Sequence, residues 1–199
     1  MHKRLRSLSL GLVLGLLLQA MPAWAISLSF QPSSQTVGVG AAFDVNLVVT
    51  GLEDGINEIV GAFALDVTYN ATVLQATGAT YSTLLGALGT DAFPDAPVLA
   101  PGLVSLLNVS LLSDLDLASL QPDSFTLATI HFSALTPGTS LLTFAGTTEL
   151  VGRNAATLEV NPLQGAVQVN AAAVPEPGTI LLLGAGLGLL FSLRRRLGR

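Results

Sequence analysis

The chain has 199 residues, half of them hydrophobic, with eight Lys and Arg, thirteen Asp and Glu, and no cysteine. This length suits one ordinary domain with appendages. The lack of cysteine excludes disulfides, thiolate metal sites and thiol nucleophiles. Between Ile26 and Ala173 one basic residue, Arg153, stands against twelve acidic residues. The resulting net charge of −11 argues against nucleic acid as a partner, because phosphate backbones would be repelled.

The N-terminal segment has the three parts of a secretory signal peptide. A basic start precedes the leucine-rich run Leu8–Leu18, and Ala23 and Ala25 then supply a small-x-small cleavage pattern. The apolar run is too short to predict a membrane span, although an uncleaved anchor is the alternative. We therefore expect a signal peptide over residues 1–25 and export of the chain from Ile26 onward.

Short alternating runs divided by Gly, Pro, Asn and Asp predict an all-β domain over residues 26–170. In one run Phe63, Leu65 and Val67 should face the core, and Asp66 should face solvent. The other strand candidates show similar strand-like patterns and span residues 26–30, 43–50, 73–76, 103–111, 126–134, 141–144, 157–160 and 166–169. About nine strands predict a two-sheet sandwich or jelly roll.

Two local features interrupt this pattern. Gly78 indicates a turn after the 73–76 strand. The segment 115–120 is the one plausible helical turn, with Asp114 as its N-cap.

A second apolar segment, residues 179–193, precedes the basic stop formed by Arg194, Arg195 and Arg196. Its fifteen residues span about 22 Å as a helix, somewhat less than a ~30 Å hydrocarbon core. Arginines that snorkel, together with the preceding residues, can make up the difference. The segment therefore predicts a transmembrane helix, and the positive-inside rule places the tail 194–199 in the cytoplasm.

The linker 171–178 contains Pro175, Glu176 and Pro177, which predict an extended, exposed peptide beside the membrane. This motif, followed by a glycine-rich apolar segment and an arginine cluster, closely resembles the PEP-CTERM sorting signal. The alternative is an ordinary tail anchor after a proline linker.

The resemblance implies processing by exosortase, a membrane-bound, cysteine transpeptidase-like enzyme of Gram-negative bacteria that make exopolysaccharide. It also implies a location: the inner membrane before processing, and the cell surface or extracellular matrix afterwards.

The order of the predicted strands also resembles cohesin domains. The opening strands Leu28–Phe30 and Phe43–Leu47, the segment Gly61–Asn70, and the later strands Leu127–Phe132 and Gly165–Val169 carry the likeness. In the third strand, the Asp-Pro of the family's turn is replaced by Asn-Ala. The resemblance implies a nine-stranded jelly roll related to cellulose-binding modules, and cohesins bind dockerins.

Catalytic chemistry finds little support in these residues. His131 shares a strand face with Leu127, Thr129 and Ser133, and no second histidine of the domain can complete a metal set or a catalytic triad. The candidate carboxylate pairs fall in loop-like stretches, where acids commonly form turns: Asp91 with Asp95, Asp114 with Asp116, and Glu53 with Asp54. Asp114 and Asp116 are also candidate calcium ligands. We expect no enzyme activity, no catalytic or metal-site residues, and no cofactor apart from this candidate calcium.

The sequence also contains few residues typical of a ligand-binding surface. Tyr69 and Tyr81 are the only rings of an exposed type, whereas Phe43, Phe63, Phe132 and Phe144 occupy core-like positions. The segment 86–102 is expected to be a long loop of the kind that carries recognition.

We therefore expect an exported, non-catalytic binding or matrix protein associated with exopolysaccharide or biofilm, whose ligand is an envelope protein or a polysaccharide. The alternatives are a carbohydrate-binding module and a structural matrix protein without a discrete ligand.

Overall fold

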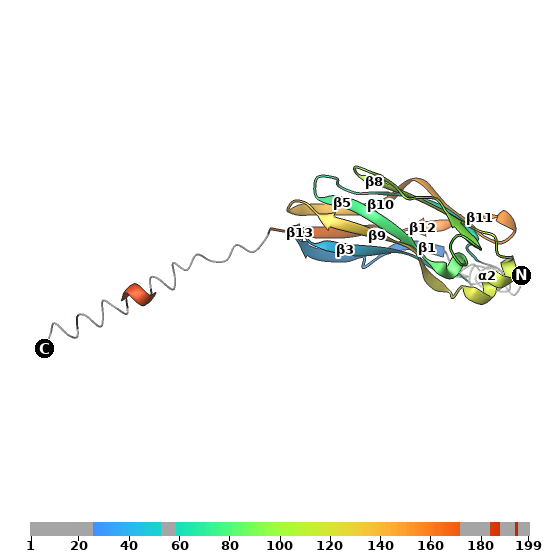
Figure 1. Cartoon of the computed structure of the whole chain (residues 1–199), viewed down its shortest axis with the longest axis horizontal. Helices are drawn as coiled ribbons and strands as arrows, with labels where there is room; N and C mark the ends of the chain where they lie inside the picture. The colour runs from blue at the N-terminus through green and yellow to red at the C-terminus, as the bar shows by residue number, and fades with distance from the viewer. Residues whose placement is uncertain (1–25, 53–58, 172–183, 188–193, 195–199) are drawn as a thin grey trace, which may run out of the picture.

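The computed structural model describes residues 26–52, 59–171, 184–187 and 194. Two β-sheets pack face to face in an elongated sandwich (Figure 1). The helix α2 (Asp114–Leu120) lies at one end, and the strand β13 (Gly165–Asn170) finishes at the other. The predicted all-β, two-sheet class is therefore confirmed.

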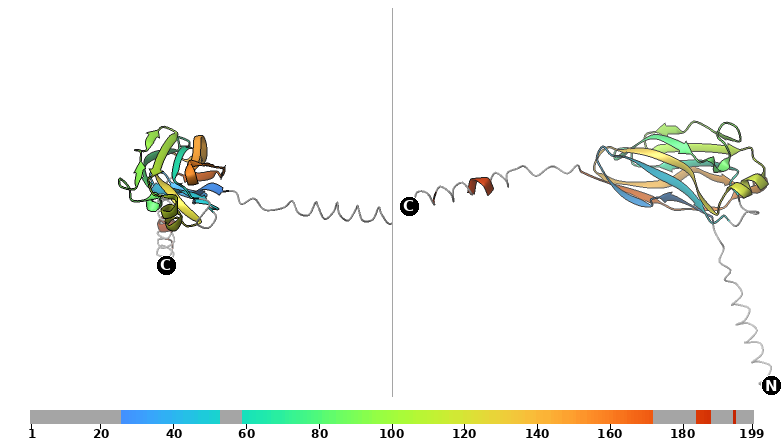
Figure 2. Two further views of the ribbon diagram at one scale, coloured as in Figure 1. Left: turned by 90° about the vertical axis from the view of Figure 1, so that its right-hand side faces the viewer. Right: turned by 60° about the horizontal axis from the view of Figure 1, so that its bottom comes forward.

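One sheet has five strands. In spatial order they are β12 (Val160–Pro162), β1 (Ile26–Gln31), β3 (Ala42–Thr50), β9 (Ser124–Ala134) and β5 (Leu74–Tyr81). All neighbours in this sheet are antiparallel except β1 and β12. Figure 2 brings this sheet forward in its right-hand view.

The other sheet has eight strands. Its main path runs β2 (Ser34–Gly38), β13, β10 (Gly138–Val151), β4 (Ala62–Thr68), β8 (Leu103–Ser110) and β6 (Ala92–Pro94). The short strands β7 (Val98–Ala100) and β11 (Thr157–Leu158) pair with β8 and β10. Two 3₁₀ turns, η1 (Thr83–Leu85) and η2 (Arg153–Ala155), complete the described elements of this domain.

Alternation along the strands builds the core between the sheets. Phe63, Leu65 and Val67 of β4 are at most 1% exposed, as predicted, because every second side chain of a strand points to the same face. The same pattern in β1 buries Leu28 and Phe30. Apolar residues from both sheets thus form a single core cluster.

The chain passes between the two layers after β1. Phe30, the last core residue of β1, stacks on Phe144 of β10 with ring centroids 4.4 Å apart. The same ring lies against Gly165 of β13, where an added Cβ would come within 2.9 Å of Phe30 Cβ. A side chain at position 165 would therefore push the sheets apart.

Three local predictions differ from the structure, and two of them involve bulges. Gly78 does not end a strand: β5 continues to Tyr81, because the register against β9 shifts between Ala76 and Gly78. Leu127 does not share the face of His131: it is fully buried, because the pairing of β3 with β9 shifts at this point. An extra residue in one strand reverses the faces of those beyond it.

The third difference concerns the cap of α2. The N-cap is Ser113, whose hydroxyl oxygen accepts a hydrogen bond from Asp116 N, and Asp114 is the first helical residue. Both residue types favour N-caps, so the sequence alone did not distinguish them.

The predicted signal peptide and its cleavage residues Ala23 and Ala25 lie outside the described residues. Of the predicted membrane segment 179–193, only residues 184–187 are described, and these are helical. Within the described ranges, no helix is both long and apolar enough to cross a bilayer.

Core packing makes a direct prediction for Leu65. Replacing it with Ala should lower the free energy of unfolding by about 2–5 kcal/mol, because a cavity remains between the sheets. Gln75, exposed on β5, is the control, and Gln75→Ala should change stability by about 0.5 kcal/mol or less. Urea denaturation of the fragment 26–171 measures both values. Equal losses for the two variants would contradict the assigned faces.

Candidate binding surface

The outer face of the eight-stranded sheet carries an exposed apolar strip. The strip consists of Phe93, Val98, Leu107 and Val109, whose side chains are 49%, 60%, 38% and 38% exposed. The strand register places them together: Phe93 lies opposite Val109, and Val98 opposite Ser105, which shares a face with Leu107. Opposite Val109 and Leu107, β4 presents the small side chains of Ala62 and Ala64.

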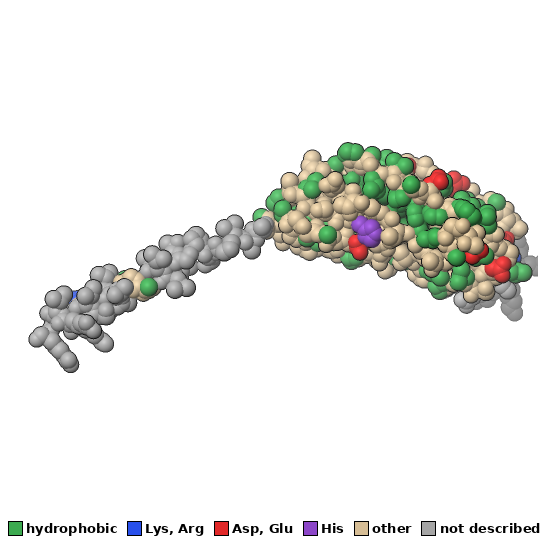
Figure 3. Space-filling model, viewed as in Figure 1, with side chains coloured by type: hydrophobic (Ala, Val, Ile, Leu, Met, Phe, Trp, Pro, Cys, Tyr) green, Lys and Arg blue, Asp and Glu red, His purple; other side chains and the backbone are tan. Residues whose placement is uncertain are grey.

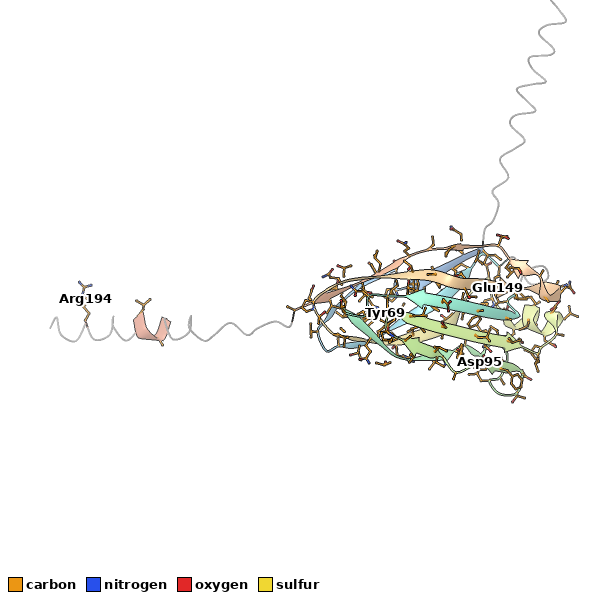
Figure 4. All side chains as sticks on the ribbon, turned by 90° about the horizontal axis from the view of Figure 1, so that it is seen from above. Tyr69, Asp95, Glu149 and Arg194 are labelled. Carbon is orange, nitrogen blue, oxygen red and sulfur yellow. The ribbon has the colours of Figure 1, made fainter. Side chains whose placement is uncertain are left out.

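A groove of about 370 Å³ lies along this strip. Its lining includes Asp95, Val98 and Leu107 on the β8 side and Asp66 and Thr147 on the β4 side. Glu149 of β10 lies opposite Ala64, so it borders the β4 side of the same face. In Figure 4, Asp95 and Glu149 flank the β4–β8 pair. The apolar strip is thus rimmed by carboxylates.

Asp66 holds one wall of the groove in place. Its Oδ2 accepts a hydrogen bond of 3.0 Å from Thr147 N, in the stretch where β10 bulges away from β4. Gly146 precedes Thr147 with φ +65°, and a Cβ there would lie 2.6 Å from Asp66 Oδ2. Asp66 faces outward as predicted, but it also fixes the bulge.

Tyr81 holds the opposite wall. Its hydroxyl donates to the Asp95 carbonyl oxygen at 3.0 Å, and Asp95 N donates to Leu107 O at 3.0 Å. The ring packs beside Phe63, with centroids 6.1 Å apart. A residue of the five-stranded sheet therefore positions the link between β6 and β7, which borders the apolar strip.

The outer face of the five-stranded sheet is polar by contrast. Thr129 donates to Asn46 Oδ1 at 2.8 Å, and the hydroxyls of Ser27 and Thr50 lie 2.6 Å apart. His131 Nδ1 lies 2.7 Å from Asp44 Oδ1 on the neighbouring strand, and this pair stands out in Figure 3. Three pairs of polar side chains on this face therefore bond to one another across neighbouring strands.

Three carboxylates of the predicted pairs take part in local hydrogen bonds, whereas Asp95 contributes to the rim of the groove. Asp91 accepts from Ala87 N, Asp114 from Asn154 N, and Asp116 from the Ser113 hydroxyl. Glu53 and Asp54 lie outside the described residues. Over the described ranges, no group of three His, Asp or Glu side chains converges in a metal-binding arrangement.

The two tyrosines are not the exposed platforms that their residue type suggested. Tyr69 is half-buried, packs edge-on against Phe132 at 5.3 Å, and donates its hydroxyl to Ala100 O. Tyr81 is tied to Asp95 as described above. Both rings are therefore partly covered by the domain itself.

The sequence did not indicate the apolar strip. Residues 86–102, expected as one long loop, contain β6 and β7, which bring Phe93 and Val98 beside β8. The strand β8 carries apolar residues on both faces, so its sequence pattern did not show which face points to solvent. Of the sorting motif and the basic stop, only Arg194 is described, and it is exposed.

Burial of Tyr81 has a consequence at alkaline pH. Burial raises the pKa of the Tyr81 phenol above its ordinary value of 10.0. A hydrogen bond with the Leu107 backbone lowers this pKa, and the nearby Asp95 carboxylate raises it further. The folded domain therefore keeps this proton at a pH where the unfolded chain has released it. Stability should consequently fall as pH rises above about 10.

Urea midpoints measured at about pH 8 and about pH 11 test this for the wild type and Tyr81→Phe. The comparison at the lower pH isolates the cost of the lost hydrogen bond. The variant should lose less stability between the two pH values, and an identical loss would rule out Tyr81 as the source.

Comparison with known proteins adds a motif and a fold. Residues 173–196 match the PEP-CTERM protein-sorting motif. No curated protein sequence matches the chain significantly.

Three solved cohesins illustrate the structural likeness. The first is the sixth cohesin of scaffoldin B from Acetivibrio cellulolyticus, which was solved with a Cel5 dockerin mutant. It is 14% identical to this chain with a TM-score of 0.58, and the match covers 73% of this chain and 99% of the cohesin. The type I cohesin of OlpA from Clostridium thermocellum, also solved with a dockerin, has 12% identity and a TM-score of 0.59, with the same coverage.

The cohesin module of a family 33 glycoside hydrolase from Clostridium perfringens has 17% identity and a TM-score of 0.57. That match covers 75% of this chain and 100% of the module. The chain therefore combines a β-sandwich with the fold of cohesin domains and a PEP-CTERM sorting motif.

Proposed function

We propose that this exported protein is a non-catalytic binding module whose cohesin-like domain holds a protein partner through the apolar strip. The observation that carries the proposal is the strip itself: four exposed apolar side chains on one face, beside a groove. An exposed apolar patch with a polar rim is typical of a protein–protein interaction site.

The acidic residues around the strip indicate which kind of partner can bind there. Asp66, Asp95 and Glu149 surround the strip, and no Lys or Arg lies among the groove-lining residues. A partner with an apolar centre and basic flanks would satisfy this rim, whereas a second copy of this acidic domain would bring like charges together. The dockerin complexes of the similar cohesins support a protein rather than a glycan as the ligand.

Association with exopolysaccharide or biofilm remains part of the proposal and follows from the sorting motif. In this view the transmembrane segment 179–193 anchors the chain in the inner membrane until exosortase acts on the linker 171–178. Processing then releases the domain to the cell surface or matrix, where the strip can join it to another envelope protein.

The strip can be tested with one charge placed at its centre. Leu107→Asp should weaken binding to the partner about tenfold or more, because it buries an unpaired charge in the interface. Thr80→Asp, which adds the same charge on the exposed outer face of the five-stranded sheet, should leave the affinity within about twofold. The partner is first captured from envelope extract by the wild-type domain, identified by mass spectrometry and purified for titration.

Equal affinities for the two variants would contradict the proposed face. Capture that survives protease treatment of the extract, together with a positive glycan array, would instead support the carbohydrate-binding alternative. Thermal melts of each variant confirm that the domain remains folded.

The sorting motif makes a separate prediction. Glu176→Ala, or replacement of both Pro175 and Pro177 with Ala, should leave export intact but block C-terminal processing, because the enzyme loses its extended, charged recognition segment. Mass spectrometry of the envelope fraction measures removal of the tail. Gln168→Ala, a nearby change upstream of the linker, is the control. Normal removal in the motif variants would refute recognition through these residues.

A further inference from the structure

The end of the sandwich where β13 finishes is a continuous surface formed by four connections, which we call the tail-side end. The connections are residues 38–41, 69–73, 101–102 and 135–137. Backbone hydrogen bonds join them to one another and to β13: Val39 N to Asn170 O (3.1 Å), Gly40 N to Ala134 O (2.8 Å), Leu135 N to Val73 O (2.8 Å) and Tyr69 N to Gly102 O (3.1 Å).

This surface carries no charge. None of the four connections contains Asp, Glu, Lys or Arg. The described connections at the α2 end, in contrast, hold several acids: Asp91, Asp114, Asp116, Asp123 and Glu159. Asp44 and Asp66, the acids closest in sequence to the tail-side end, are held inside strands by His131 and Thr147.

The tail-side end is also apolar at its tips. Val39 and Leu135 are 38% and 40% exposed, although each occupies a turn where polar residues are common. A recess of about 440 Å³ opens beside Leu135, and its lining includes Leu74, Leu99 and Pro101. Two apolar tips therefore lie at the end where β13 finishes, and an apolar recess lies beside one of them.

The sorting tail starts from this end. β13 finishes at Asn170, and only the eight residues 171–178 separate it from the apolar segment that begins at Thr179. Even fully extended, eight residues span at most about 29 Å. The tether keeps the tail-side end close to the lipid surface, and a short tether raises the effective concentration to roughly millimolar, so a weak contact suffices.

We propose that in the anchored protein the tail-side end rests on the bilayer surface, with Val39 and Leu135 in contact with the lipid headgroup region. This inference rests on the proposed anchoring by residues 179–193. The charge distribution supports a lipid surface as the occupant, because anionic headgroups repel carboxylates within about a Debye length of ~8 Å. The acids of the α2 end are held at the far end of the sandwich, beyond that range.

The full chain reconstituted in vesicles of phosphatidylethanolamine and phosphatidylglycerol provides the test. Because the chain lacks cysteine, Leu135→Cys and Val39→Cys can each carry a single environment-sensitive fluorophore. Leu115→Cys is the matched control, since Leu115 is 71% exposed on α2 at the opposite end. Flotation of the vesicles first establishes that the labelled chains are anchored.

Interfacial side chains lie about 5–10 Å into the headgroup and acyl boundary, so lipids with a quencher near the top of the acyl chain should lower fluorescence at positions 135 and 39 at least about twofold. The probe at position 115 should be unaffected. Adding Leu135→Asp to Val39→Cys should restore most of the fluorescence, whereas the matched change Leu115→Asp should not.

Anchored chains with no quenching at positions 39 and 135, or with equal quenching at position 115, would overturn the membrane contact while leaving the anchor intact. Contact with a second copy would overturn it too, and would appear as energy transfer between labelled chains without lipid quenching. Chains that fail to float would overturn the anchor and this inference together.

Discussion

Apolar packing between the two sheets holds this domain together, because a chain without cysteine has no disulfide to join its layers. Phe30 shows how closely the two sheets pack. Its ring stacks on Phe144 and lies against the bare backbone of Gly165, so the space between the layers at this point leaves no room for a side chain at position 165. This interior uses one face of every long strand, and only the outer faces and the two ends remain for function.

The outer faces of the two sheets differ in how well they can bind a partner. On the five-stranded sheet, hydroxyl, amide and imidazole groups pair across neighbouring strands and form a polar surface. On the eight-stranded sheet, the strands β6 and β7 extend an apolar surface that nothing in the described domain covers. Tyr81 connects the two, because it reaches from the edge of one sheet to position Asp95 beside the strip on the other. The Tyr81 hydroxyl therefore links the packing of the core to the geometry of the proposed binding surface.

The sequence was informative wherever a linear pattern determined the outcome. The faces of Phe63, Leu65 and Val67 followed from unbroken alternation, and the sorting motif could be recognised because its parts are contiguous in the chain. The same reasoning failed at Leu127 and Gly78, where the strands contain bulges. One extra residue in a strand reverses the faces of the residues beyond it, and the amino-acid sequence gives no sign of the extra residue. The apolar strip combines residues of β8 with residues of two three-residue strands, β6 and β7, which contain or border prolines and looked like a loop. Such a surface exists only through tertiary pairing.

The positions of the strip and the tail-side end determine which contacts can coexist. The strip lies on the side of the sandwich, along β8, whereas the sorting tail continues from the end. A contact between the tail-side end and lipid would therefore leave the strip open, so the anchored chain could hold a partner before processing. Cleavage in the linker would end the membrane contact, because a weak surface interaction depends on the tether that raises its effective concentration. The partner contact needs no such tether, and release of the domain would therefore carry the bound partner with it.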